Sequence, residues 1–273
     1  MAAGSTAQLT GKTVIVTGAA SGIGEAFARR FVADGACCVL ADVQDGKGQA
    51  IAEELGPGAV FRHVDVTRED DVAGAVDFAC ERFGALHAMV NNAGILGAVG
   101  PIAGTSLAEW EHTVAVLLTG VFLGTKHAAR VMVPARSGAI LNVASTAGVQ
   151  GGLGPHAYTA AKHGVVGLTR SVASELRYVG IRINCLAPGA VASPLTALAI
   201  TGDPDAVDRA AASMAERSPI GRTPLPEDLA GAAAYLISDE AWYVNGAVFV
   251  VDGANEVLQS RAHRQYHEGA GRP

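Results

Sequence analysis

Short apolar segments alternate along the chain with longer segments in which apolar residues recur every three or four positions. The short segments are rich in Val, Ile, Leu and Ala, and they predict buried strands at 12–17, 36–41, 59–64, 86–90, 139–144, 181–187 and 247–251. The longer segments predict amphipathic helices at 25–34, 69–83, about 107–121, about 157–178 and 227–237. Repeated strand–helix units predict an α/β fold of the Rossmann type, with a doubly wound, mostly parallel sheet and helices on both faces.

The same pattern contains no linker between apolar segments, so we expect a single domain over 1–273 with its core at about 10–254. The alternation is interrupted at about 195–222, where we expect an insertion, a candidate substrate loop that is partly helical at 205–217. The segment 255–273 continues past the last predicted strand as a polar tail with several Arg and His. Its residues leave two alternatives open, disorder and contact with a neighbouring subunit.

Composition narrows the class of protein. The chain has 273 residues, of which 49% are hydrophobic and 17% charged, and its formal net charge is −6. Lys and Arg are scattered, which disfavours nucleic acid and anionic membranes as partners. Four irregularly spaced Cys and the lack of clustered ligand side chains predict reduced thiols and no metal site. Residues 1–8 lack signal-peptide features and no apolar run reaches the ~18 residues of a membrane helix, so we expect a cytoplasmic protein.

Small and polar residues follow the predicted strands at their carboxyl ends. These residues are Gly18, Asp42, Asp65, Asn91, Ser145 and Pro188. In open parallel sheets, ligands bind beyond the carboxyl ends of the strands. The sequence therefore predicts one binding site along a single edge of the sheet.

The first predicted strand leads into a glycine-rich turn, G-x-x-x-G-x-G, at Gly18, Gly22 and Gly24, which opens a helix. Glycines let a ligand approach the backbone and a helix amino terminus attracts phosphate, so this arrangement favours a diphosphate. Asp42 ends the second strand 24 residues after Gly18, where a carboxylate accepts hydrogen bonds from a ribose hydroxyl and repels a 2′-phosphate. Because Ser21 also adds no cation to the turn, we predict NAD rather than NADP. The alternative that Asp42 caps the following helix stays open.

Tyr158 and Lys162 are four residues apart on a predicted helix and therefore share a face. A phenol titrates near ~10, and a cation within ~4–6 Å lowers that pKa. Ser145 lies 13 residues before Tyr158, at the end of a predicted strand, where its hydroxyl can meet the phenol. The three side chains have the groups needed to move a proton on and off a carbinol oxygen. A Tyr and a Lys at this spacing are more often a packed ring and a solvated charge, so this interpretation depends on the rest of the chain.

Over roughly residues 10–254 the chain resembles the short-chain dehydrogenase/reductase (SDR) family. The motifs that carry the resemblance are 17–24 (TGAASGIG), Asp65-Val66, 91–94 (NNAG), Ser145 with Tyr158-x-x-x-Lys162, Pro188-Gly189 and 251–253 (VDG). The resemblance implies that Tyr158 is the acid/base, that Ser145 donates a hydrogen bond to the substrate oxygen, and that Lys162 lowers the Tyr158 pKa and holds the nicotinamide ribose. It implies a cofactor site made of Gly18, Ser21, Gly22, Ile23, Gly24, Asp42, Val43, Asp65, Val66, Asn91, Ala93, Gly94, Val116, Tyr158, Lys162, Pro188, Gly189, Val191 and Ser193. Family members are commonly tetramers, so we expect a homotetramer.

One position departs from the family pattern. Within 116–120 (VLLTG), Leu117 stands where relatives usually have an Asn whose main-chain carbonyl is thought to hold a water in a proton relay. A carbonyl survives the change to Leu, whereas the hydrogen bonds of the Asn side chain do not. Leu117 therefore leaves open a nucleotide-binding protein with weakened catalysis as the alternative to an active enzyme.

Segments 120–132 and 151–158 resemble a branch of the family that contains xanthoxin, secoisolariciresinol and borneol dehydrogenases and bacterial cyclic-alcohol dehydrogenases. The resemblance implies NAD-dependent interconversion of a secondary alcohol on an apolar ring system, of terpenoid, steroid or alicyclic type, and its ketone. The rival within enzymes is an NADPH-dependent ketoreductase of the 3-oxoacyl-carrier type, which Asp42 disfavours.

The residues near the predicted acid/base agree with an apolar substrate. We expect a substrate pocket formed by Leu96, Val149, Leu153, Leu195 and Leu198, with Ser145 at the reacting oxygen. His156 is a candidate hydrogen-bonding partner of the substrate, and the alternative is a structural role at the start of the helix. His112, His127 and His163 are interpreted as structural or exposed.

Overall fold

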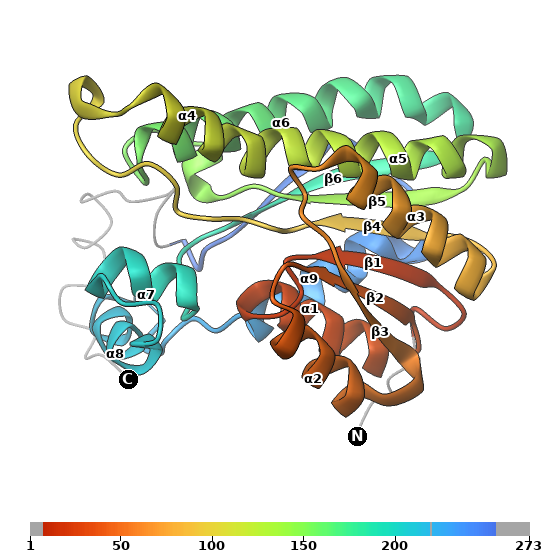
Figure 1. Cartoon of the computed structure of the whole chain (residues 1–273), viewed down its shortest axis with the longest axis horizontal. Helices are drawn as coiled ribbons and strands as arrows, with labels where there is room; N and C mark the ends of the chain where they lie inside the picture. Colours follow the sequence, from red (N-terminus) through yellow and green to blue (C-terminus); the bar gives the residue numbers. More distant parts are fainter. Residues whose placement is uncertain (1–7, 219, 255–273) are drawn as a thin grey trace, which may run out of the picture.

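The computed structural model describes residues 8–218 and 220–254, and its centre is one sheet of seven strands (Figure 1). The strands are β1 (Thr13–Thr17), β2 (Cys37–Asp42), β3 (Ala59–His63), β4 (Ala88–Asn91), β5 (Gly138–Val143), β6 (Ile181–Pro188) and β7 (Val248–Val251). They lie in the order β3-β2-β1-β4-β5-β6-β7, and every neighbouring pair is parallel. The predicted doubly wound α/β fold is therefore confirmed. The predicted tail at 255–273 lies outside the described residues.

Helices cover both faces of the sheet because the central strands bury both of their faces. In β1, Val14 and Val16 join the apolar cluster under α1 and α9, whereas Ile15 joins the cluster under α3, α5 and α6. The helices are α1 (Gly22–Ala33), α2 (Asp45–Leu55), α3 (Glu69–Phe83), α4 (Leu107–Val114), α5 (Gly120–Ala135), α6 (His156–Leu176), α7 (Pro194–Thr201), α8 (Val207–Arg217) and α9 (Glu227–Ile237). Figure 1 shows α7 and α8 beside the carboxyl ends of the strands, apart from the two helical layers.

Three helical segments differ from the sequence-based expectation, and one of them is α7, which begins the predicted insertion and lies outside the part expected to be helical at 205–217. Helix α2 was not predicted, because it contains two glycines and buries few large side chains. One of them, Gly48, is needed for packing, since a Cβ there would lie 2.2 Å from the ring of Phe61 on β3. The helix predicted at about 107–121 is α4 followed by a π-helical turn, η3 (Ala115–Thr119), which continues into α5 as far as Ala135.

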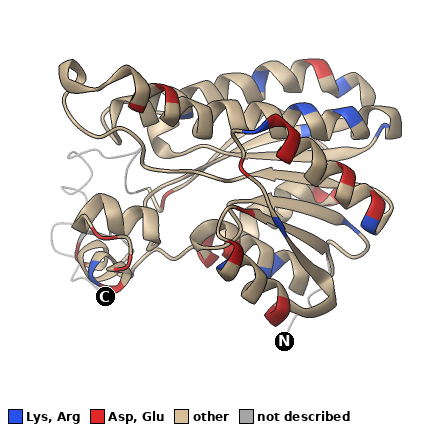
Figure 2. Cartoon of the chain, viewed as in Figure 1, with Lys and Arg blue, Asp and Glu red and all other residues tan. Residues whose placement is uncertain are grey.

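The run Leu107–Ala135 has the length and hydropathy of a membrane span, although half of its most apolar window is buried. Its apolar side chains are used within the fold, because α5 packs on β4, α3 and α6. Figure 2 shows acidic and basic positions along α3 and α6 and basic positions along α5. Packing against the sheet therefore accounts for the hydropathy of this helix.

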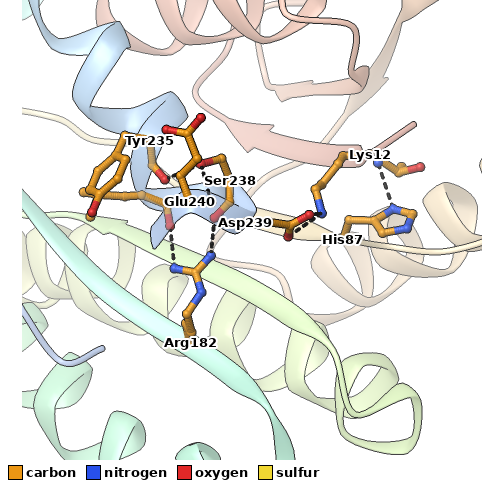
Figure 3. Close-up of polar contacts among 9 residues, drawn as sticks. Lys12, His87, Arg182, Tyr235, Ser238, Asp239 and Glu240 are labelled. Carbon is orange, nitrogen blue, oxygen red and sulfur yellow. Dashed lines mark hydrogen bonds and ion pairs between the residues drawn. The ribbon is translucent and has the colours of Figure 1, made fainter. Parts of the chain in front are cut away.

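Polar contacts join separate elements at the amino-terminal ends of the strands (Figure 3). Arg182, at the start of β6, donates to the carbonyl oxygens of Leu236 and Ser238 at the end of α9, at 2.8 Å each. Lys12, just before β1, forms an ion pair of 2.7 Å with Asp239. Nδ1 of His87 accepts the Thr13 N–H at 2.9 Å, so this nitrogen carries no proton. Burial lowers the pKa of His87, which favours the same neutral ring. These contacts hold together the amino-terminal ends of the strands, which lie opposite the predicted site.

Candidate active site

A cleft of about 790 Å³ lies at the carboxyl ends of the strands. The predicted site residues that line it are Gly18, Ser21, Gly22, Ile23, Asp42, Val43, Asp65, Val66, Ala93, Gly94, Leu96, Val116, Ser145, Leu153, Tyr158, Lys162, Pro188, Gly189, Val191, Ser193 and Leu195. They come from the ends of six strands and from the helices that follow. The convergence on one sheet edge that the sequence predicts is thus present in the structure.

The glycine-rich turn depends on close backbone packing. Gly18 has φ of +66°, and a Cβ there would lie 2.7 Å from Cα of Ala93 in the turn after β4. Gly24 does not line the cleft; a Cβ there would lie 2.0 Å from the carbonyl oxygen of Gly18, so its role is to let α1 start directly behind the turn. The amino terminus of α1 is therefore held at the cleft, where it can meet a diphosphate.

A hydroxyl joins the turns after β1 and β4. Oγ1 of Thr17 accepts the N–H groups of Asn92 and Ala93 at 2.9 and 3.0 Å. The Asn92 amide donates in return to the Thr17 carbonyl at 3.0 Å. Asn92 lines the cleft, whereas the predicted Asn91 does not: its side chain is 2% exposed and donates to Asn142 on β5 at 2.8 Å. Neighbouring strand residues point to opposite faces, and the sequence alone does not say which of two adjacent asparagines faces a ligand.

Asp42 is buried at the end of β2, and both of its carboxylate oxygens have backbone partners. Oδ2 accepts the Ala20 N–H of the glycine-rich turn at 2.9 Å, and Oδ1 accepts the Gln44 N–H at 2.9 Å. The N-cap residue of α2 is Gln44. The alternative that Asp42 caps this helix is therefore wrong. Asp42 is thus a fixed negative charge beside the turn, with lone pairs that remain suited to ribose hydroxyls.

Ser145, Tyr158 and Lys162 meet at the same cleft. Nζ of Lys162 lies 5.6 Å from the centre of the Tyr158 ring and donates to the Val143 carbonyl at 2.7 Å. Lys162 is 3% exposed, and this burial lowers its pKa to about 8. Oγ of Ser145 accepts the Ala147 N–H at 3.1 Å, which fixes the hydroxyl at the end of β5. An ammonium held this close can stabilise a phenolate on Tyr158.

Gly148 brings the serine to the tyrosine helix and was not singled out from the sequence. It ends the short turn η4 (Thr146–Gly148) that follows Ser145. A Cβ at Gly148 would lie 2.7 Å from the carbonyl oxygen of Lys162, so only glycine lets this turn rest on the α6 backbone. The signal in the sequence was a glycine three residues after the catalytic serine candidate.

Several apolar side chains contribute to the cleft lining and are called the apolar wall below. Leu96, Leu153 and Leu195 line it as predicted, together with Val99, Ala199 and Ile200. Val149, Leu198 and His156 do not line it, and all three are exposed. The histidine at the cleft is instead His112 on α4, one helical turn before Val116, which lines it as well. Local spacing favoured His156 because it is close to Tyr158 in sequence, whereas the fold brings α4 over the pocket.

Leu117 lies within the π-helical turn η3 and is fully buried. A Cβ at Gly94 would lie 3.3 Å from Cδ2 of Leu117, so the leucine packs behind the turn after β4. The cleft is lined by Val116 rather than by the Leu117 side chain. The altered backbone of a π turn, which often occurs at functional sites, is therefore present without an Asn.

Comparisons with known proteins agree with this geometry. A family model described as "Enoyl-(Acyl carrier protein) reductase" matches residues 18–254. Momilactone A synthase of Oryza sativa subsp. japonica is 46% identical over 255 residues, which cover 93% of this chain and 93% of the relative. (+)-Borneol dehydrogenase 2 of Salvia officinalis is 45% identical, with 92% of this chain and 93% of the relative covered. A crystal structure of levodione reductase aligns with a TM-score of 0.84 at 36% identity, over 92% of this chain and 100% of that chain.

These matches extend over nearly the whole described fold and include the strand-end turns that form the cleft. The relatives also confirm the predicted resemblance to borneol dehydrogenases. The chain therefore belongs to the short-chain dehydrogenase/reductase family, and it is a short-chain alcohol dehydrogenase that works with a nicotinamide dinucleotide.

Proposed function

We propose that the protein interconverts a hydrophobic cyclic secondary alcohol, of terpenoid, steroid or alicyclic type, and its ketone with NAD. The observation that carries the proposal is the division of one cleft into two unlike ends. Ser145, Tyr158 and Lys162 lie at β5 and α6 and share the cleft with several apolar side chains, whereas Asp42 bonds the glycine-rich turn at the end of β2, which β1 and β4 separate from β5. An apolar wall with a few placed polar groups is typical of sites for small hydrophobic ligands.

The residues present fit a nicotinamide dinucleotide. The amino terminus of α1 suits the diphosphate, Asp42 suits the adenosine ribose, and Pro188, Gly189, Val191 and Ser193 line the cleft near Lys162, where the nicotinamide would lie. When bound, the cofactor supplies the ring that takes a hydride from the carbinol carbon or returns it to the carbonyl carbon.

Side chains of the protein transfer the proton of the same reaction. In the oxidation direction, Tyr158 takes the proton of the alcohol hydroxyl, and Ser145 holds the oxygen by a hydrogen bond. Lys162 stabilises the phenolate before the transfer, because its ammonium is fixed by Val143 within 6 Å of the ring. In the reduction direction, Tyr158 returns the proton to the oxygen.

The substrate class follows from the apolar wall and from the relatives. Among the described residues that line the cleft, Lys162 is the single basic side chain of the Lys or Arg type. A carboxylate or phosphate on the substrate would therefore find no second such cation there. The relatives include a borneol dehydrogenase, and borneol is a bicyclic secondary alcohol. Both observations support a ring system that is mostly hydrocarbon.

A screen for NADH formation tests the proposal. The panel contains cyclic terpenoid, steroid and simple alicyclic alcohols, and a 3-oxoacyl thioester with NADPH represents the rival reaction. Turnover of a cyclic alcohol with NAD supports the proposal, and turnover of the thioester alone contradicts it. Cofactor binding without turnover of any compound would also contradict it, and Leu117→Asn would then test whether the leucine is the cause. The cytoplasmic location and the homotetramer stay predictions.

Cofactor choice is predicted to depend on the charge of Asp42. Asp42→Asn keeps an oxygen for the Ala20 N–H and removes the charge that repels a 2′-phosphate. We expect the ratio of kcat/KM with NAD to kcat/KM with NADP to fall by at least about tenfold, which corresponds to about 1.4 kcal/mol. Initial rates with both cofactors measure the ratio. Asp65→Asn is the control, since it removes a second carboxylate of the cleft and should leave the ratio within about twofold of the parent. An unchanged ratio in Asp42→Asn would argue against the ribose role.

His112 is predicted to select substrates that carry a second oxygen. It is exposed on α4 and lines the otherwise apolar wall, so its imidazole can bond a remote hydroxyl or carbonyl. We expect His112→Leu to raise KM for such alcohols by about 2- to 10-fold, as for one lost hydrogen bond, without raising KM for alcohols that have a single oxygen. Steady-state kinetics on matched alcohol pairs measures the difference. His156→Leu is the control, because His156 lies outside the cleft lining; an equal effect of both variants would disprove the assignment.

A further inference from the structure

A row of buried polar side chains crosses the sheet directly behind the catalytic residues. Asn91 on β4 and Asn142 on β5 are register partners, and Nδ2 of Asn91 donates to Oδ1 of Asn142 at 2.8 Å. Nδ2 of Asn142 donates to Oγ1 of Thr169 on α6 at 3.0 Å. The exposed fractions are 2% for Asn91 and 0% for both Asn142 and Thr169. Two strands and the helix that carries Tyr158 are thus joined by side-chain hydrogen bonds.

The direction of these bonds is fixed. The Thr169 hydroxyl donates to the Val165 carbonyl at 2.8 Å, so it meets Asn142 as an acceptor. The Asn142 amide must then turn its NH₂ to α6 and its oxygen to Asn91. Around the row the same face of the sheet is apolar, with Met89, Ile140 and Ile183 buried. A buried amide without partners is costly, so α6 has one favourable position over β5 with respect to this row.

Thr169 and the catalytic pair share one face of α6. Thr169 follows Lys162 by seven residues, which is two turns and about 10.5 Å along the axis. Lys162 donates to the carbonyl of Val143, the residue directly after Asn142 on β5. Two adjacent residues of one strand therefore hold one helix at two points. Rotation of α6, or a shift by one residue, would break both bonds.

We propose that Asn142 and Thr169 are positioning residues, which fix the rotation and axial position of α6 so that Tyr158 and Lys162 face the cleft. The inference rests on the proposed function for its kinetic readout, but it concerns the placement of the helix. A displacement of about 1 Å at reacting groups can cost about 10²-fold in rate. A helix held at one point instead of two should therefore lose activity as well as stability.

The chain offers a matched control on the neighbouring helix. Oγ1 of Thr125 on α5 accepts a hydrogen bond from the same Asn91 amide at 3.3 Å, and Thr125 is 4% exposed. Thr125→Val and Thr169→Val each remove one buried hydroxyl of one network at nearly constant volume. Only Thr169 lies on the helix of Tyr158 and Lys162. A merely structural role predicts similar effects of the two variants.

Kinetics gives the first readout, with Thr169→Ser as the conservative rescue. We expect Thr169→Val to lower kcat about tenfold at saturating substrate, while KM for NAD, whose diphosphate site is at α1, changes less than about twofold. Thr125→Val should keep kcat within about twofold of the parent while its urea midpoint falls, and Thr169→Ser should recover most of kcat. Equal values of kcat in Thr169→Val and Thr125→Val would overturn the proposal. Should Thr169→Val fail to fold, Thr169→Ala removes the same hydroxyl without an added methyl.

The second readout needs no substrate. Ultraviolet difference titration of each variant against the same variant carrying Tyr158→Phe reports the ionisation of the Tyr158 phenol. A displaced ammonium stabilises the phenolate less, so the phenol pKa should rise by at least about 0.5 in Thr169→Val but not in Thr125→Val. That shift would support the positioning role even if the alcohol panel showed no turnover, which would count against the proposed function alone. Turnover of the panel with no shift and no loss of kcat would overturn the positioning role alone.

Discussion

Tyr158→Phe is expected to lower kcat by about 10²–10⁴-fold, the range typical of the loss of a general acid or base. In the proposed reaction the phenol takes the proton of the alcohol, and phenylalanine has no hydroxyl that could replace it. Ser145 lines the same cleft, but its Oγ already accepts the Ala147 N–H, and an aliphatic hydroxyl is a far weaker acid than a phenol. The ring itself stays in place, so binding of NAD should change little.

The measurement is steady-state oxidation of an active cyclic alcohol, with NAD affinity followed by fluorescence quenching. Tyr243→Phe is the control, since Tyr243 is 85% exposed and does not line the cleft. Turnover of Tyr158→Phe close to that of the parent would refute the assignment of the acid/base. A large loss in Tyr243→Phe would instead show that the assay responds to general damage.

Lys162→Met is expected to lower kcat by about 10²–10³-fold, as for other fixed groups that stabilise charge at a reacting centre. It should also change how stability depends on pH. Burial lowers the pKa of Lys162 from 10.5 to about 8 in the folded protein without cofactor. Below pH 8 the folded protein holds a buried ammonium at Lys162, and the full free-energy cost of burying that charge destabilises the fold.

The sign of the pH effect follows from proton uptake. Between pH 8 and 10.5 the unfolded chain binds more protons at this lysine than the folded protein does, so the free energy of unfolding rises with pH. One pKa unit corresponds to about 1.4 kcal/mol, which gives a ceiling of about 3 kcal/mol over that window. Lys162→Met lacks this gain. The free energy of unfolding of the parent, relative to the variant, should therefore increase between pH 8 and 10.5.

Urea denaturation of the cofactor-free proteins at several pH values measures the difference. Lys47→Met on α2, an exposed lysine outside the cleft, is the control and should follow the parent. Parallel curves for the parent and Lys162→Met across the window would disprove the buried charge. Unchanged kcat in Lys162→Met would disprove its action on Tyr158.

The order of strands and helices could be predicted because the burial of an element determines the spacing of apolar residues within its own sequence. A strand buried on both faces is a continuous apolar run, as in β1, and a helix with one buried face repeats its apolar residues every three or four positions, as in α3 and α9. The apolar pattern of helix α2 is weak because a glycine, Gly48, packs against β3 and has no side chain to mark the buried position. The cleft position could be predicted for the same kind of reason, since parallel strands bring their carboxyl ends to one edge.

The amino-acid pattern thus predicted the fold, the end of the strands at which the cleft lies, and the presence of Ser145, Tyr158 and Lys162 in that cleft. The tertiary structure alone decided which of Asn91 and Asn92 faces the cleft, which of His112 and His156 lines it, and which side chains form hydrogen bonds with α6. The physical reason is that periodicity along one element reports only which side of that element is buried. Contacts between elements depend on the rotation and axial offset with which they pack, and those follow from the side chains of every neighbour together.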